Sequence, residues 1–254
     1  MLLTDIIFLL TTNMKNTSND SEMTMAEHFE ELRQRVLYSI FVFIIITTAN
    51  FFFIEPIVSF LQLPAHGIQF LQLAPGEYFF STMKIAFYLG LILSTPFLIY
   101  QLIVFAIPGL TISERNIIIP LVVASISLFV IGLSFAYFLL IPAALSFFIS
   151  YGANLVQPLW SFEQYFDFIL VLLLSTGIVF QIPIIQVVLG ILKIISSSQM
   201  FSIWKYILVL STVVGAILTP STDPITQLAM ACAVLFLYFV GIVFVVAIEK
   251  QKIF

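Results

Sequence analysis

Apolar residues dominate six stretches of this chain, and each stretch is long enough to form a helix that crosses a membrane. A helix rises ~1.5 Å per residue, so ~20 apolar residues cover the ~30 Å hydrocarbon core of a bilayer. The pattern therefore predicts an all-α integral membrane protein with six transmembrane helices. We place these helices at residues 36–54, 83–106, 117–141, 164–192, 203–219 and 225–248.

The segment EHFEELRQRV, residues 27–36, precedes the first of these helices and carries a two-faced helical pattern. At ~100° per residue, one side of the helix presents Met25, Phe29, Leu32 and Val36, and the other side presents Glu27, Glu30, Glu31 and Gln34. Carboxylates grouped with basic neighbours at the water boundary of a membrane indicate a place to hold a cation.

Composition supports the membrane assignment. Hydrophobic residues make up 61% of the 254 residues and charged residues only 9%, and the mean hydropathy of +1.17 is outside the range of soluble domains. A net charge of −4 with nine Lys and Arg argues against a nucleic-acid partner. With one cysteine, Cys232, and two histidines, His28 and His66, we expect no disulfide within the chain, no metal site and no cofactor.

The distribution of Lys and Arg predicts the topology. If the helices alternate in direction, every Lys and Arg except Lys84 falls on one side of the membrane, and basic residues are in excess on the cytoplasmic or stromal (cis) side. We therefore predict that both termini lie on the cis side. Residues 1–24 lack the basic start and cleavage site of a signal peptide, so we expect a disordered tail before one membrane domain at residues 25–250.

Two of the predicted helices are unusual. The fourth contains Gln181, Pro183 and Gln186, and because proline removes a backbone hydrogen bond we expect a kink beside a buried amide. The fifth has about 17 apolar residues, which span ~26 Å and fall short of an ordinary bilayer.

Polar residues mark the starts of three predicted helices. Ser161 with Gln164 has the spacing of a capping box, Asp223 precedes Pro224 as an N-cap, and Ser113 precedes Glu114 in the same way. The long trans-side loops at residues 55–82 and 142–163 are expected to cap the bundle.

The sequence lacks the motifs of an enzyme. It contains no HExxH motif, no GxSxG motif and no phosphate-binding glycine loop. It also contains no pair of intramembrane carboxylates that could act as general acid and general base. A solute or ion transporter is an alternative function, but transporters place ionisable groups near the midplane and repeat their helices. Here the deep polar residues are mainly Gln101, Gln181 and Gln186. An assembly factor for another membrane complex is a second alternative.

Two acidic positions on the predicted cis side are candidate binding residues. Glu31 lies in the amphipathic segment beside Arg33, and Glu114 lies beside Arg115 in the loop ISERN. Each position also has a local explanation, because a Glu31–Arg35 pair on an exposed helix contributes ~0.3–0.5 kcal/mol and an acidic residue in a first turn favours the helix dipole. Since both positions share one side of the membrane, together they can bind one basic ligand.

Several motifs in collinear order define a resemblance over residues 25–250. They are EHFEELRQRV, FLQLAPGEYFF, FAIPGLTISERN, LWSFEQYF with FQIPI, and ILTPSTDPITQ. The chain resembles the TatC family, the membrane receptor subunit of the twin-arginine (Sec-independent) protein translocase, and is most similar to cyanobacterial and plastid-encoded members.

The resemblance implies a receptor for signal peptides that carry an Arg pair. Such a receptor assembles with TatA- and TatB-like single-span subunits and moves folded proteins across the membrane using the proton gradient. The implied setting is the plastid thylakoid membrane, with a bacterial inner membrane or another organelle as alternatives, and the implied further partners are membrane lipid and other copies of the chain.

Residue by residue, the resemblance assigns Glu31 and Arg33 to the signal-contacting positions and Glu114 to the acidic position in the first cis loop. Glu30, Arg35 and Arg115 are supporting candidates. A carboxylate binds a guanidinium through two parallel hydrogen bonds, so Lys in place of Arg in the ligand should be a poor substitute.

Two deeper positions also match the family. Gln181 matches a polar intramembrane position that is Glu in some bacterial members, and because an amide does not titrate, an obligatory proton-carrying role is not expected. A hydrogen bond from Gln181 to a neighbouring helix is the other interpretation. Asp223 matches a trans-side position, which its capping role also explains. His66 and Lys84 are interpreted as loop and interface residues.

Overall fold

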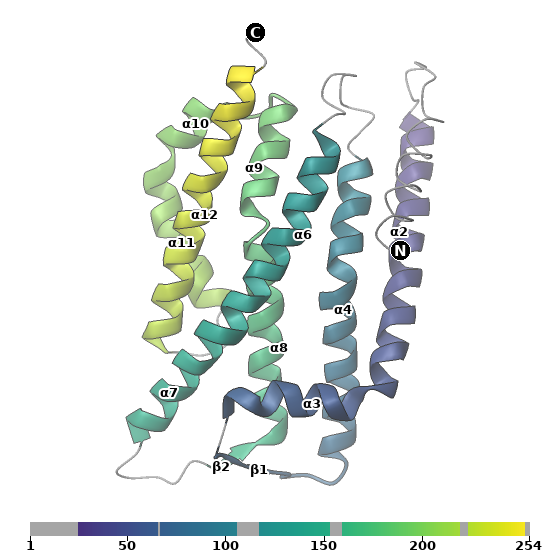
Figure 1. Cartoon of the computed structure of the whole chain (residues 1–254), viewed down its shortest axis with the longest axis vertical. Helices are drawn as coiled ribbons and strands as arrows, with labels where there is room; N and C mark the ends of the chain where they lie inside the picture. Colours follow the sequence, from purple (N-terminus) through teal and green to yellow (C-terminus); the bar gives the residue numbers. More distant parts are fainter. Residues whose placement is uncertain (1–24, 66, 106–116, 153–158, 219–222, 252–254) are drawn as a thin grey trace. The chain divides into compact units, whose positions relative to one another are not determined.

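The computed structural model describes residues 25–65, 67–105, 117–152, 159–218 and 223–251. The chain divides into two compact units, residues 1–34 and residues 35–254, and helix α2 (Met25–Phe52) begins in the first unit and continues into the second. All other described elements belong to the second unit (Figure 1). They are α3 (Ile54–Gln62), η1 (Leu63–Ala65), β1 (Gln69–Leu71), α4 (Glu77–Phe105), α6 (Ile118–Phe135), the π-helix η3 (Ala136–Leu140), α7 (Ile141–Gly152), β2 (Leu159–Ser161), α8 (Phe162–Val179), α9 (Ile182–Ile191), α10 (Ser197–Ser202), α11 (Trp204–Leu218) and α12 (Pro224–Gln251).

The prediction of an all-α membrane protein is confirmed. Five helical segments are long and apolar enough to cross a membrane: Ala26–Phe52, Glu77–Phe105, Ile118–Tyr151, Phe162–Ile191 and Pro224–Lys250. The predicted fifth span corresponds to α11, which has only 15 residues. At ~1.5 Å per residue it covers about 22 Å, so this helix is even shorter than the sequence suggested.

Several helices extend beyond the spans that the sequence predicted. The amphipathic segment and the first span form one helix from Met25, α4 begins at Glu77 rather than residue 83, and the third span continues through η3 and α7 to Gly152. Hydropathy underestimates these helices because their polar or aromatic ends lie beyond the apolar run but keep the helical backbone hydrogen bonds. The predicted tail at residues 1–24 and the predicted cap at Ser113 fall outside the described residues.

The segments predicted as long loops contain regular structure. Residues 55–82 include most of α3, β1 and the start of α4, and β1 pairs in parallel with β2 in the register Gln69–Leu159, Phe70–Trp160 and Leu71–Ser161. Helix α3 lies across the axes of α4 and α8 at the end where those two helices begin (Figure 1). We call this end of the second unit the strand end, and the opposite end, which carries α10, the α10 end.

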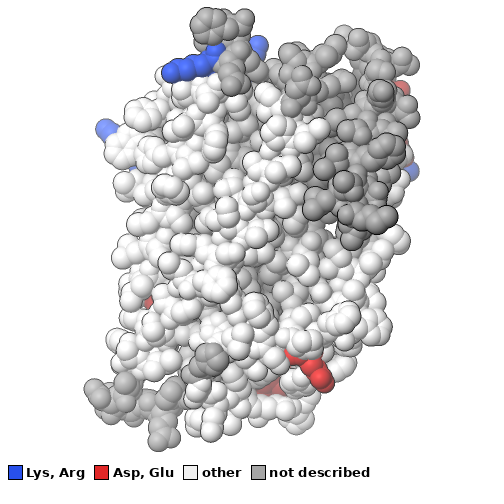
Figure 2. Space-filling model, viewed as in Figure 1, with Lys and Arg blue, Asp and Glu red and all other residues white. Residues whose placement is uncertain are grey.

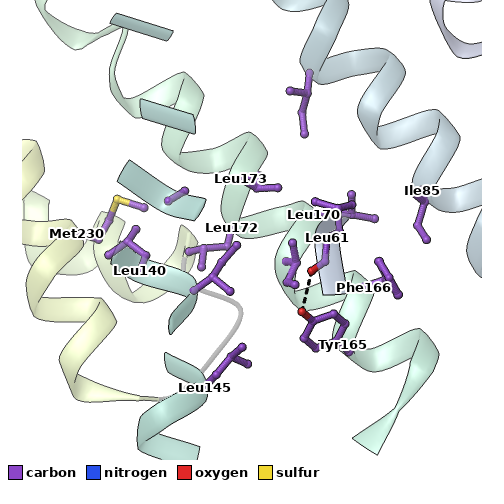
Figure 3. Packing of buried hydrophobic residues seen from close by; sticks show 14 of the residues in the cluster. Leu61, Ile85, Leu140, Leu145, Tyr165, Phe166, Leu170, Leu172, Leu173 and Met230 are labelled. Carbon is purple, nitrogen blue, oxygen red and sulfur yellow. Dashed lines mark hydrogen bonds between the residues drawn. The ribbon is translucent and has the colours of Figure 1, made fainter. Parts of the chain in front are cut away.

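Helix α8 is the centre of the core. It packs against α4 on one side and α6 on another. Its side chains Leu170 and Leu172 are fully buried (Figure 3), as is Ile169. Two glycines let α6 and α8 approach closely: a Cβ on Gly132 would lie 2.8 Å from the ring of Phe180, and a Cβ on Gly177 would lie 2.6 Å from the ring of Phe129. Gly132 of α6 thus accommodates Phe180, the residue that follows α8, and Gly177 of α8 accommodates Phe129 of α6.

The predicted kink in the fourth span is a two-residue interruption of the helix. Helix α8 ends at Val179, and α9 begins at Ile182 with Pro183 in its first turn. Proline is tolerated there because backbone N–H groups in the first turn have no acceptor within the helix. Helix α9 then packs against α12, and α12 against α11. A Cβ on Gly215 of α11 would lie 2.9 Å from the carbonyl oxygen of Gln227 in α12. The two helices can therefore lie this close because residue 215 is a glycine and has no side chain.

Candidate functional site

The first three turns of α2 hold four of the candidate residues, Glu30, Glu31, Arg33 and Arg35. Glu30 accepts hydrogen bonds from the guanidinium of Arg33 at 2.7 Å and from the amide of Gln34 at 3.4 Å. The Arg33 and Glu30 side chains are 69% and 46% exposed, so this pair lies in contact with solvent and is weak. Residues 25–34 contain Glu27, Glu30 and Glu31 but a single Arg. The beginning of α2 is therefore an acidic, solvent-accessible surface.

Arg35 belongs to the second unit and makes a contact that the sequence did not predict. Its guanidinium donates to the Oε1 of Gln101 on α4 at 3.0 Å, and its carbonyl accepts from the hydroxyl of Ser39. Gln101, one of the predicted deep polar residues, thus tethers α2 to α4. Glu114 and Arg115 lie outside the described residues, so a two-part site with Glu31 stays a prediction.

Asp223 caps α12, as its sequence context predicted. Its Oδ2 accepts from the backbone N–H of Thr226 at 2.8 Å and from the Thr226 hydroxyl at 2.5 Å, and the residue is fully buried. These bonds satisfy an N–H group at the start of α12 that has no partner within the helix. Ser161 likewise accepts from the N–H of Gln164 and caps α8.

Gln181 lies at the break between α8 and α9 and bonds to α6. Its Oε1 accepts from the hydroxyl of Ser125 at 2.7 Å, and its Nε2 donates to the carbonyl oxygen of the same residue at 3.2 Å. Both residues are buried. The amide therefore joins two membrane helices, which is the second of the two interpretations made from the sequence.

A packing role for Gln181 leads to a specific prediction. We expect Gln181→Leu to lower stability by about 1 kcal/mol, close to the effect of Ser125→Ala, and the double variant to cost less than the sum because both changes remove the same contact. Protein transport should be retained in all three variants. Loss of transport in Gln181→Leu but not in Ser125→Ala, at equal protein levels, would contradict the packing role.

A cluster of charged residues at the strand end was missed from the sequence. The ammonium of Lys84 on α4 contacts Glu163 Oε1 at 2.9 Å and Asp167 Oδ1 at 2.8 Å, both on α8. Lys84 was interpreted from the sequence as an interface residue without a named partner, and the structure brings these two carboxylates to its ammonium. The i,i+4 spacing of Glu163 and Asp167 could have indicated this cluster from the sequence, because it places both carboxylates on one face of a helix.

Glu77 was also missed. Its carboxylate accepts from the N–H groups of Leu73 at 2.5 Å, Ala74 at 3.0 Å and Glu163 at 3.2 Å, and from the hydroxyl of Ser161 at 3.0 Å. One buried side chain thus binds the turn before α4 and the start of α8. Among the described residues there is no group of His, Cys, Asp or Glu side chains suited to hold a metal ion.

Comparison with known proteins decides the family. The family described as Sec-independent protein translocase protein (TatC) matches residues 27–232. The chain belongs to the TatC family. This family consists of protein translocase components, so the predicted absence of enzymatic activity and the predicted role in protein transport are confirmed.

Relatives of this TatC family member come from plastid-bearing organisms and a cyanobacterium. An uncharacterized tatC-like protein of Pyropia yezoensis is 59% identical over 232 residues, which is 91% of each chain. The TatC protein of Synechocystis is 52% identical over 224 residues, 88% of each chain. The chloroplastic TATC of Arabidopsis thaliana is 46% identical over 225 residues, 88% of this chain and 66% of the relative. These relatives support the predicted plastid or thylakoid membrane.

A solved structure confirms the fold. The crystal structure of a twin-arginine translocase receptor, TatC, superposes with a TM-score of 0.77 at 34% identity, covering 88% of this chain and all of that chain. The six-span architecture predicted from the sequence, with α11 as its short fifth span, is the architecture of the TatC family.

Proposed function

We propose that this TatC family member is the receptor of a twin-arginine translocase and binds the Arg pair of a signal peptide at the acidic start of α2. The observation that carries the proposal is the excess of carboxylates over guanidinium groups in residues 25–34, on a helix that continues unbroken into a membrane span. Glu31 and Arg33 are the principal contacts, with Glu30 and Arg35 in support. Glu114, assisted by Arg115, supplies the second acidic position.

The weak Glu30–Arg33 pair makes the exchange of partners easy. An exposed pair of this kind contributes at most ~1 kcal/mol, so an incoming guanidinium can replace Arg33 at the Glu30 carboxylate at little cost. Arginine has five donors in a rigid fork and gains two parallel bonds to a carboxylate, whereas lysine gains only one point contact. This difference explains why the ligand should contain Arg rather than Lys.

The charge distribution supports an orientation with the α10 end on the cis side. Lys193, Lys205 and Lys250 lie near this end, at the end of α9, the start of α11 and the end of α12. On the face of the second unit seen in Figure 2, Lys and Arg side chains lie toward the α10 end and acidic side chains lie toward the strand end. Basic residues are retained on the cis side of membranes, so the strand end is the trans end.

Transport of a folded protein tests this function against the transporter alternative. Vesicles that contain the protein and single-span TatA- and TatB-like subunits should import a folded reporter with a twin-Arg signal peptide when a proton gradient is imposed. A reporter whose signal lacks the Arg pair is the control. Flux of small solutes without reporter import would instead favour a solute or ion transporter.

The α11–α12 edge is the proposed docking surface for the single-span subunits. Helix α11 is short, and its side chains Val209, Val213 and Ile217 are exposed. A short helix thins the bilayer around it and thereby favours association with another span. Other copies of this chain and membrane lipid are further proposed partners, and an unrelated complex recovered in detergent would favour an assembly factor.

We predict that Cys at Val209 or Val213, in a Cys232→Ser background, forms disulfides with Cys in the span of a single-span subunit. Cys at Val130, an exposed residue of α6, serves as a matched control and should give at most a tenth of that yield, because proximity controls the rate of disulfide formation. Crosslinks confined to α2 or α6 would contradict the proposed docking surface.

A further inference from the structure

Three lysines lie at the α10 end, each at one end of an apolar helix. Lys193 follows α9, Lys205 is the second residue of α11, and Lys250 is the last residue but one of α12. These helix ends all lie at the α10 end of the second unit (Figure 1). Segments long enough to cross a membrane end at Ile191 and at Lys250, so the lysines mark the depth at which the chain leaves the hydrocarbon. Their long side chains can therefore reach the lipid headgroups.

The three lysines are exposed and surround α10. This helix has six residues and is ~9 Å long, and it separates Lys193 from Lys205. Lys250 adjoins Glu249, whose carboxylate accepts from the N–H of Ser197, the first residue of α10, at 3.0 Å and also from the Ser197 hydroxyl. Each lysine thus lies within a few residues of α10 or next to a residue bonded to it.

Positive charge at this end is not neutralised by the described residues of the second unit. None of the three lysines forms an ion pair within the part of the chain that the structure describes. Glu249 is the one described acidic residue of the second unit at this end, and both oxygens of its carboxylate accept hydrogen bonds from Ser197. An anion from outside the chain would complete these lysines.

Lys193 occupies a backbone conformation that favours glycine. Its φ of 56° lies in the left-handed region, where a Cβ atom is crowded and costs free energy. The N–H of Lys193 bonds to the carbonyl of Gly190 at 3.1 Å, and the N–H of the next residue bonds to the carbonyl of Leu189 at 3.0 Å. These bonds define a helix-ending motif in which glycine usually fills the position of Lys193. A lysine at this unfavourable position indicates a use for its ammonium group.

Apolar and aromatic side chains flank the lysines. Trp204 and Tyr206 lie on either side of Lys205 in the sequence, Trp204 half-buried and Tyr206 exposed. Ile194 and Phe201 are exposed as well. Trp and Tyr are typical of the headgroup level of a membrane, and exposed aliphatic and Phe side chains favour the hydrocarbon beside it. A lipid with an anionic headgroup fits this mixture better than a soluble acidic protein, because it offers both a negative charge and acyl chains.

We propose that Lys193, Lys205 and Lys250 bind the anionic headgroups of membrane lipids around α10. Lysine binds a phosphate as a point charge, and basic residues beside a membrane are attracted to anionic lipid. The proposal gives a chemical class to the lipid partner suggested above. It uses none of the residues assigned to the signal peptide and does not depend on that site.

Quenching of tryptophan fluorescence by brominated lipids tests the proposal. The chain has two tryptophans: Trp204 beside Lys205, and Trp160 in β2 at the strand end, both half-buried. Trp160→Phe therefore reports from Trp204 alone, and Trp204→Phe is the matched control that reports from Trp160. Each variant is placed in vesicles of phosphatidylcholine and phosphatidylglycerol, with bromine on one lipid or the other. Both leaflets have the same composition, so the orientation of the protein does not affect the result.

Trp204 should report a preference for phosphatidylglycerol over phosphatidylcholine of about fivefold, because each lysine near a membrane surface favours anionic lipid. At Trp160 the preference should be less than about twofold, since the Lys84 ammonium at the strand end already contacts Glu163 and Asp167.

Two lysine variants in the Trp160→Phe background separate lipid binding from a structural role. Lys193→Gly and Lys205→Gln should each lower the preference at Trp204 to about twofold or less. Lys193→Gly also relieves the left-handed backbone, so its melting temperature in detergent should be equal or higher. If Lys193 served only the dipole of α9, the same variant would melt at a lower temperature and keep the lipid preference.

Equal quenching of Trp204 by the two brominated lipids would overturn the proposal and would leave an acidic polypeptide as the partner of these lysines. A preference that neither Lys193→Gly nor Lys205→Gln lowers would also overturn it, because other groups would then attract the lipid. No precursor takes part in these measurements, so failure here is distinguishable from failure of the signal-peptide proposal.

Discussion

Charge reversal at Glu31 or Glu114 should abolish crosslinking of this protein to a precursor with a twin-Arg signal peptide. A charge-assisted hydrogen bond contributes ~1.5–3 kcal/mol, and replacing a carboxylate by an ammonium adds repulsion to that loss. Since ~1.4 kcal/mol is a tenfold change in binding, each of Glu31→Lys and Glu114→Lys should lower the crosslinking yield at least tenfold. The yield is measured with membranes that contain equal amounts of each variant.

Glu55→Lys is the matched control for these variants. Glu55 is an exposed acidic residue in the first turn of α3, at the strand end, so its reversal changes net charge by the same amount away from the proposed site. Crosslinking should be retained in this variant. Unchanged crosslinking in both Glu31→Lys and Glu114→Lys would remove these two residues from the site.

Removal of the Glu77 carboxylate should cause the largest loss of stability among single polar substitutions. Glu77→Ala leaves the N–H groups of Leu73, Ala74 and Glu163 and the hydroxyl of Ser161 without their shared acceptor. Unsatisfied donors near a buried position are costly, and the loss loosens the starts of α4 and α8 together. We expect a fall in melting temperature of roughly 5 °C or more in detergent.

Glu77→Gln distinguishes the role of charge from that of size. The amide has one acceptor oxygen and places N–H donors toward backbone N–H groups, so this nearly isosteric change should also destabilise the protein. Glu55→Gln at the same end should shift the melting temperature by less than about 1 °C, because substitutions of exposed residues usually change the free energy of unfolding little. Equal behaviour of the Glu77 and Glu55 variants would show that the four bonds to Glu77 contribute little.

Local patterns in the sequence were sufficient for most of the helices. Apolar run lengths located the spans, the polar-then-proline context of Asp223 indicated the cap of α12, and Pro183 indicated the interruption before α9. Each of these features depends on residues within a few positions of each other, and the backbone hydrogen bonding of a helix is equally local.

The missed features all depend on partners distant in the sequence. Lys84 meets Asp167 and Glu77 meets Ser161 across about 80 residues of chain, and β1 pairs with β2 across a similar separation. No periodicity within a single segment records such a pairing. Short elements such as α3 were assigned to loops because nine residues are too few for a membrane span.

The central claim is that the acidic start of α2 recognises guanidinium groups. A photo-reactive residue in place of Phe29, beside Glu30 and exposed, should crosslink to a precursor with an Arg pair in its signal peptide. With the same precursor carrying a Lys pair, the yield should fall about tenfold, since lysine cannot form two parallel bonds to a carboxylate. Equal yields from the Arg and Lys precursors would contradict the account.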